Sequence, residues 1–187
     1  KRALGFDPAR PLLLVVGGSL GARTINDSIA AGLDRLTADG RYQVMWQTGK
    51  LYAEECARAA AGHSDVKAMP FIADMARAYS AADLVVARAG AGTISELQLA
   101  GKTAILVPSP NVAEDHQRKN AMALVERDAA VMVPDSEARE RLVDEALELI
   151  ADSSRRNLLA ANAAQMALRE SDTRIVDTIY RIIEEKK

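Results

Sequence analysis

The sequence predicts an α/β fold: a doubly wound parallel sheet of about six strands, with a helical segment at the C-terminus. Short apolar runs alternate with stretches of helical spacing as far as residue 133, which is typical of a parallel sheet covered on both faces. Gly- or Pro-rich turns follow the apolar runs, and the chain from residue 137 onward has helical spacing. We therefore expect a single domain over residues 1–187, with a connecting segment at 1–11.

The apolar runs are expected to form the strands. The first, Leu12 to Val16, is continuously apolar, as the central strands of parallel sheets are. The others are expected at 42–47, 66–69, 83–87, 103–107 and 130–133. In such sheets ligands bind beyond the carboxyl ends of the strands, so the turns that follow these runs are the candidate sites.

Helices are expected between and after the strands. The first, at 22–36, carries Ile25, Ile29, Leu33 and Leu36 on one face. The helix that follows the turn at 88–96 is expected to begin near 91–94 and to end before Gly101. The remaining helices are expected at 52–61, 73–80, 115–126, 137–151, 154–168 and 173–185.

Composition excludes several classes of function. The net charge of −2, the lack of a long basic block and an aromatic content of 4% argue against nucleic acid as a partner. The single cysteine, Cys56, fits a reducing cytoplasm. No cluster has the spacing of metal ligands, so no metal or other cofactor is expected, and no apolar run is long enough to span a bilayer. Because the chain begins at Lys1 rather than Met, we interpret it as part of a longer protein.

The turn at 88–96, with the sequence RAGAGTISE, is the most informative stretch. Gly90 and Gly92 allow a sharp turn after the fourth strand. The amides of residues 91–94 are expected at a new helix N-terminus, where unpaired donors and the helix dipole favour an anion. Glu96 has two interpretations. It either closes a capping box with Thr93, or it accepts hydrogen bonds from both hydroxyls of a ribose.

The loop after the first strand, GGSLGA at 17–22, is either a plain tight turn or a loop whose Ser19 and amides contact a phosphate or sugar. It lacks both the GxGxxG fingerprint and the Gly-Lys-Ser/Thr of a P-loop.

Two further stretches follow strands. Phe71 is expected in the core, whereas Ile72 either packs there or presents its backbone groups to a base edge. Asp115 is an expected N-cap. His116 and Gln117 after it either form a solvated first helical turn or hydrogen-bond to sugar hydroxyls.

Together these stretches resemble the C-terminal half of the MurG family. The matching pieces are GGSLGAR at 17–23 with Asn26, PFI at 70–72 with Asp74 and Met75, RAGAGTISE at 88–96, and EDHQRKNA at 114–121. The family consists of GT-B glycosyltransferases, which have two Rossmann-like domains. They transfer N-acetylglucosamine (GlcNAc) from UDP-GlcNAc to lipid I, the lipid-linked muramyl-pentapeptide, and so form lipid II in peptidoglycan synthesis.

The resemblance implies that this half binds the donor. Ser19 would contact the diphosphate, Ile72 the uracil, and Glu96 the ribose. Gln117, with His116 beside it, would reach the GlcNAc hydroxyls. Phosphate and sugar contacts would come from Ala91, Gly92 and Thr93, and the same binding set includes Gly18, Ile94 and Ser95.

The resemblance also implies what this half lacks. Lipid I and the catalytic base would belong to a first domain, to which the helix at 173–185 would cross back, so the chain alone would be inactive. The full enzyme would lie in the cytoplasm, peripherally on the inner face of the bacterial membrane. Three alternatives stay open: another UDP-sugar transferase, a UDP-sugar epimerase of the same architecture, and a nucleotide-binding module without catalysis.

Overall fold

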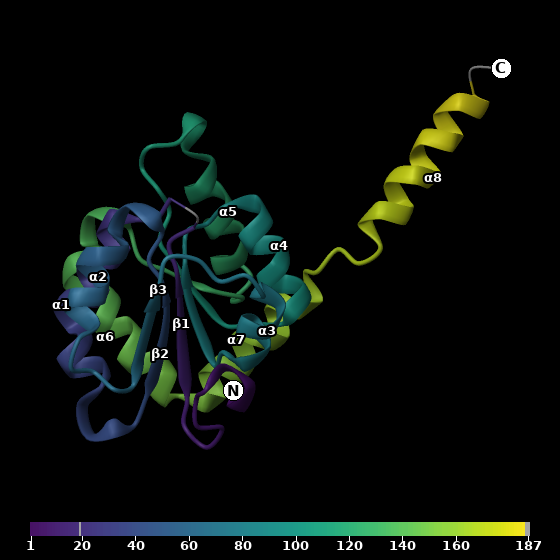
Figure 1. Ribbon diagram of the computed structural model, residues 1–187. Helices are drawn as coiled ribbons and strands as arrows, with labels where there is room; N and C mark the ends of the chain where they lie inside the picture. Colours follow the sequence, from purple (N-terminus) through teal and green to yellow (C-terminus); the bar gives the residue numbers. More distant parts are fainter. Residues whose placement is uncertain (19, 186–187) are drawn as a thin grey trace.

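The computed structural model describes residues 1–18 and 20–185, and its centre is one parallel sheet (Figure 1). The strands are β1 (Leu12–Val16), β2 (Gln43–Gln47), β3 (Val66–Met69), β4 (Leu84–Ala87), β5 (Ala104–Leu106) and β6 (Val131–Met132). They are ordered β3-β2-β1-β4-β5-β6, and every neighbouring pair is parallel. The predicted doubly wound α/β fold is confirmed, and the order of the strands reverses between β1 and β4.

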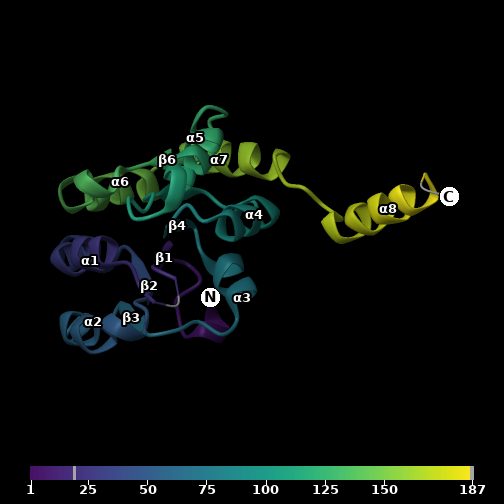
Figure 2. The ribbon, with the colours of Figure 1, turned by 90° about the horizontal axis from the view of Figure 1, so that it is seen from above.

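Helices cover both faces of the sheet (Figure 2). One core lies beneath α1 (Arg23–Leu36), α2 (Ala53–Ala60) and α6 (Ala138–Ala151). The other lies beneath α3 (Met75–Ala81), α4 (Ala91–Ala100) and α5 (His116–Val125). The helix α7 (Ser153–Gln165) contributes Leu159 to the first core and Ala163 to the second.

The first helix shows how the sequence pattern becomes packing. Its predicted apolar positions are all buried in α1. Gly32 on the same helix faces α6, where a Cβ atom would lie only 2.4 Å from Cγ2 of Val143. The glycine therefore lets α1 and α6 approach closely over the sheet.

The segment at 1–11 is docked at the edge where the strands begin. Phe6 is buried in the second core, and Lys1 forms an ion pair with Asp83, at 2.7 Å from Nζ to Oδ2. Lys67 donates from Nζ to the carbonyls of Leu4 and Gly5, both at 2.8 Å. The N-terminal residues thus lie at the opposite edge of the sheet from the turns that the sequence singles out.

The helix α8 (Ser171–Glu184) stands away from the rest of the domain (Figures 1 and 2). Its described side chains are all exposed. They include an apolar stripe, which we define as Ile175, Val176, Ile179, Tyr180, Ile182 and Ile183, each 45–63% exposed. In the described part of the chain, no helix combines the length and apolar character needed to cross a membrane.

Candidate functional site

A polar cavity of about 470 Å³ lies beyond the carboxyl ends of the strands, where the strand order reverses. We call it the edge cavity. The loops after β1, β2, β4, β5 and β6 all contribute to its wall, with Arg23, Tyr52, Arg88, Asn111 and Gln117 among the lining residues. A reversal point of this kind is where doubly wound sheets bind their ligands.

The loop after β1 is a tight turn that packs against the loop after β2. The Gly21 amide donates to the Gly18 carbonyl at 3.1 Å, and both residues have positive φ. A Cβ atom on Gly49 would lie 2.1 Å from the Gly21 nitrogen. The positive φ of Gly18 and Gly21 fits both interpretations of this loop, so its contact with a phosphate or sugar stays a prediction. Gly18 is exposed, whereas Ser19 lies outside the described residues.

Asn26, one of the residues that match the MurG family, supports this contact from within α1. Its buried side chain donates from Nδ2 to the Thr48 carbonyl at 2.8 Å and accepts from Nε1 of Trp46 at 2.9 Å. It therefore holds the end of β2 against α1.

Two helices begin at this edge without a side-chain cap. The N-caps of α1 and α4 are Ala22 and Gly90, and the first turns of both helices lack acidic residues. In α4 the Ile94 amide donates to the Gly90 carbonyl at 2.9 Å, so the prediction of an unpaired Ile94 amide is wrong. Helix geometry leaves the amides of residues 91–93 without an intrahelical acceptor, and such termini attract anions.

The capping-box interpretation of Glu96 is wrong. Because Gly90 is the N-cap, Thr93 is the third helical residue and Glu96 lies in the second turn of α4. Oε2 of Glu96 instead accepts a hydrogen bond from the Tyr79 hydroxyl at 3.0 Å. Glu96 lines a second cavity of about 340 Å³ between α3 and α4, together with Met75 and Leu99. The structure therefore places Glu96 and Gln117 in different cavities.

Of the neighbours Phe71 and Ile72, only Ile72 is buried. Phe71 is 55% exposed, so the prediction that it packs in the core is wrong, whereas Ile72 is 4% exposed and packs in the second core. Neighbouring residues of an extended segment point to opposite sides, so only one of the two can face the core. The Ile72 amide donates to Oε1 of Gln47 at 2.9 Å, which leaves the carbonyl as its backbone group for a ligand.

The start of α5 has an unusual backbone. Glu114 and Asp115 are consecutive non-glycine residues with φ of 55° and 53°, a left-handed conformation that clusters at functional sites. Asp115 is the N-cap, as predicted, but its side chain makes no capping hydrogen bond. His116, the first residue of α5, is exposed.

Two side chains of α5 hold neighbouring loops. Oε1 of Gln117 accepts from the Ser109 amide at 2.9 Å, and Nδ2 of Asn120 donates to the Ala89 carbonyl at 3.1 Å. Gln117 thus lines the edge cavity while it fixes the loop after β5.

Sequence reasoning missed the charged wall of the edge cavity. Arg88, at the end of β4, forms an ion pair with Asp135, whose Oδ2 accepts from the Thr24 hydroxyl at 3.0 Å. The Arg23 guanidinium lies 5.3 Å from the centroid of the Tyr52 ring. Arg23 and Arg88 belong to the motifs at 17–23 and 88–96, and Asp135 follows the end of β6. Charged residues in turns that follow strands are the sequence signal that could have identified all three.

Comparison with known proteins identifies the domain. Residues 12–179 match the glycosyltransferase family 28 C-terminal domain. The chain belongs to this family. It is 47% identical over 184 residues to a protein of Phocaeicola vulgatus and 51% identical over 187 residues to one of Parabacteroides distasonis, with 97% of the chain covered in each case. Both relatives are named UDP-N-acetylglucosamine–N-acetylmuramyl-(pentapeptide) pyrophosphoryl-undecaprenol N-acetylglucosamine transferase.

The family 28 domain also matches solved structures. The crystal structure of MurG from Acinetobacter baumannii is 31% identical, with a TM-score of 0.83 over 92% of this chain and 50% of that chain. The C-terminal CMP-Kdo binding domain of WaaA from the same organism, at 12% identity and a TM-score of 0.64, shares the fold. The chain spans about half the length of the curated relatives it matches, 49% and 50% of the two named above.

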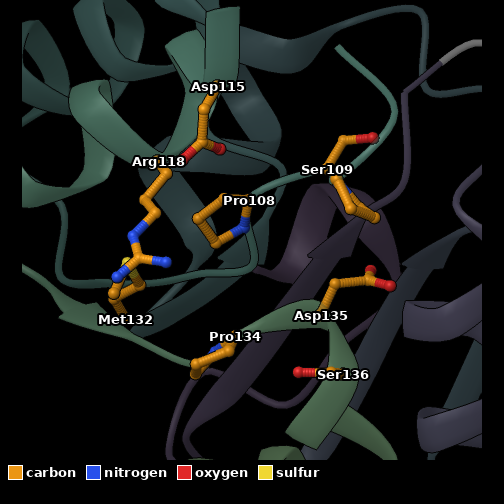
Figure 3. A pocket seen from close by; sticks show the side chains of 9 residues that line it. Pro108, Ser109, Asp115, Arg118, Met132, Pro134, Asp135 and Ser136 are labelled. Carbon is orange, nitrogen blue, oxygen red and sulfur yellow. The ribbon is translucent and has the colours of Figure 1, made fainter.

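In this family 28 domain a smaller cavity of about 250 Å³ adjoins the edge cavity and shares Ser109, Pro110 and Asp135 with it (Figure 3). Figure 3 shows Asp115 and Arg118 on one side and Asp135 on the other. The ion pair of Asp135 therefore lies at the boundary of two cavities. Across residues 1–18 and 20–185, no three His, Cys, Asp or Glu side chains are grouped as a metal site would require.

Proposed function

We propose that this chain binds UDP-GlcNAc and is the donor-binding half of a hexosyltransferase that transfers GlcNAc to lipid I, which forms lipid II in peptidoglycan synthesis. The observation that carries the proposal is the edge cavity. It lies at the reversal point of the sheet. The start of α1, which has no side-chain cap, lines it, and the N-cap of α4, Gly90, follows two residues after the lining residue Arg88. Sequence identity of 47–51% to the named transferases extends over nearly the whole chain, which supports the same donor.

In this proposal each part of the donor has its own group of residues. The diphosphate lies between the N-termini of α1 and α4, near the amides of residues 91–93 and the loop with Gly18 and Ser19. Glu96 accepts from the ribose hydroxyls, and the Ile72 carbonyl meets the uracil. Gln117 and His116 hydrogen-bond to the GlcNAc hydroxyls, and the remaining α4 contacts come from Ile94 and Ser95.

The diphosphate is held without a metal ion in this proposal. Arg23 lines the edge cavity and carries positive charge, and the two helix N-termini add the positive ends of their dipoles. Addition of EDTA should therefore leave the affinity for UDP unchanged. A loss of UDP binding on chelation, restored by Mg²⁺ or Mn²⁺, would refute this part of the proposal.

The acceptor half of the reaction is assigned to the part of the longer relatives that this chain does not match. The apolar stripe of α8 is exposed and suits a helix that packs against that first domain. The complete enzyme would work in the cytoplasm, peripherally on the inner face of the membrane that carries lipid I.

Calorimetry with UDP, UDP-GlcNAc, UDP-galactose and NAD tests the donor assignment. We expect UDP and UDP-GlcNAc to bind, with a gain from the GlcNAc group that galactose does not give. At a hundredfold excess over the Kd, bound donor stabilises the fold by about 2.7 kcal/mol. The melting temperature should then rise by roughly 5–11 °C. Binding of NAD alone would overturn the proposal, and equal affinities for UDP and both sugars would favour a nucleotide-binding module.

A transfer assay with a lipid I analogue tests the division between halves. We expect no transfer by this chain, because holding the acceptor hydroxyl in line with the anomeric carbon can supply about 7–11 kcal/mol of the barrier. Turnover by the isolated chain would refute the half-enzyme assignment. Conversion of UDP-GlcNAc to an epimer in the same assay would identify an epimerase instead.

A further inference from the structure

We infer that Tyr79 is a positioning residue for the donor: its hydroxyl fixes the Glu96 carboxylate in the orientation that accepts the ribose. The inference rests on the proposed function and deepens it. Oε2 of Glu96 accepts from the Tyr79 hydroxyl at 3.0 Å, which leaves Oε1 and the remaining lone pairs for the two ribose hydroxyls.

Tyr79 is itself rigidly held. It is 4% exposed and packs in the second core on α3, a short helix anchored at both ends. At the start of α3, Oδ1 of Asp74 accepts from the Arg77 amide at 2.9 Å. At its end, Nζ of Lys102 donates to the carbonyls of Ser80 and Ala82 at 3.3 and 3.0 Å. The hydroxyl therefore presents a fixed donor to α4.

The direction of the hydrogen bond follows from the environment of the phenol. Burial, and then the negative charge of Glu96, raise the pKa of Tyr79 above its ordinary value. The phenol thus keeps its proton throughout the physiological range. A protonated phenol donates, so the Tyr79 hydroxyl is the donor and Glu96 is the acceptor.

Glu96 needs such a partner because its own position leaves it mobile. It is exposed on the second turn of α4, where a glutamate side chain retains most of its rotamer freedom until a ligand orders it. With one oxygen held by Tyr79, part of that ordering is completed before the ribose arrives. Preorganisation of this kind increases affinity without any new contact to the ligand.

The test compares UDP with 2′,3′-dideoxyuridine diphosphate, which lacks both ribose hydroxyls, by calorimetry on the 187-residue chain. Tyr79→Phe removes only the hydroxyl and keeps the ring in the core. We expect it to weaken UDP about three- to tenfold and to leave the dideoxy analogue unchanged, as loss of an ordering hydrogen bond to a charged group should. Tyr42→Phe, at a buried tyrosine directly before β2, is the matched control and should change neither affinity.

A double-mutant cycle isolates the coupling. Tyr79→Phe should have no further effect in a Glu96→Gln background, because the carboxylate that it orients is gone.

The outcomes separate the inference from the proposed function. If Glu96→Gln weakens UDP but Tyr79→Phe does not, the positioning role is refuted and the ribose contact stands. If Tyr79→Phe weakens UDP and the dideoxy analogue equally, Tyr79 acts only on the fold and the inference fails. If Glu96→Gln leaves UDP binding unchanged, the ribose contact itself is refuted.

Discussion

Arg88 and Asp135 form an ion pair that spans the end of β5 and joins residues 47 positions apart, at 2.5 Å from Nη1 to Oδ1. Only 19% and 18% of the two side chains remain exposed. Arg88 also donates to the Val107 carbonyl at 3.1 Å, and Asp135 accepts from Thr24. The pair therefore connects the end of β4, the loop after β6 and the start of α1 into one wall of the edge cavity.

Asp135→Asn should destabilise the domain. The substitution leaves the largely covered Arg88 guanidinium without its counter-charge, and the free energy of unfolding should fall by about 1–3 kcal/mol. Urea denaturation followed by circular dichroism measures the change. The control is Asp144→Asn, whose pair with Arg35 leaves 57% and 60% of the side chains exposed, so its cost should stay below about 1 kcal/mol. Equal costs for the two variants would contradict the wall assignment.

Gln117→Ala should affect the sugar and spare the nucleotide. Gln117 lines the edge cavity, and loss of its neutral hydrogen bonds should reduce the ratio of UDP-GlcNAc to UDP affinity about three- to tenfold. The Ser109 amide loses its acceptor whichever ligand is bound, so the ratio isolates the sugar contact. Gln165→Ala, on the exposed side of α7, is the control. Equal losses for both ligands would argue against the assignment.

Cys56 should be unreactive in the folded domain. Burial, followed by the charges of Glu55 and Asp27, raises the pKa of its thiol to about 11. At pH 8 the thiol is therefore protonated, and its alkylation rate should climb only as the pH approaches the raised pKa. In urea the pKa returns toward about 8.5 and alkylation should accelerate. Iodoacetamide labelling followed by mass spectrometry tests this, and fast labelling of the folded chain at pH 8 would disprove it.

The apolar stripe of α8 should contribute little to the stability of the domain. Ile175 and Ile179 are 61% and 51% exposed, so the double change Ile175→Lys and Ile179→Lys should leave the melting temperature unchanged. By contrast, Ile29→Ala, in the core beneath α1, should cost about 2–5 kcal/mol. A thermal melt compares the two. A clear loss of stability in the lysine variant would show that α8 packs on the domain in solution.

The sheet could be predicted from sequence because its central strands are buried on both faces and so appear as continuous apolar runs. Leu12 to Val16 is the clearest case, and all five residues are buried in β1. The periodicity of α1 likewise fixed which of its faces meets the sheet. Both features depend only on neighbours along the chain.

The site was harder to predict, because its contacts depend on where segments meet in space. The capping box failed because Gly90 adopts an extended conformation and starts α4 three residues before Thr93. The Tyr79–Glu96 hydrogen bond and the Arg88–Asp135 ion pair join separate elements, so no local sequence pattern predicts them. Phe71 was misplaced because the larger apolar side chain is not always the one that the extended segment turns inward.

The close contact between Gly49 and Gly21 restricts the amino acids that position 49 can accept. With φ of 76° and the Gly21 nitrogen 2.1 Å from where a Cβ atom would be, Gly49 has no room for any other amino acid. Gly92, around which a Cβ atom would meet nothing within 4 Å, has space for a side chain although it belongs to the proposed ligand site. In a saturation mutagenesis library selected for survival, substitutions of Gly49 should therefore be lost. Gly49 would then be as invariant as the binding residues, although it has no proposed contact with the ligand.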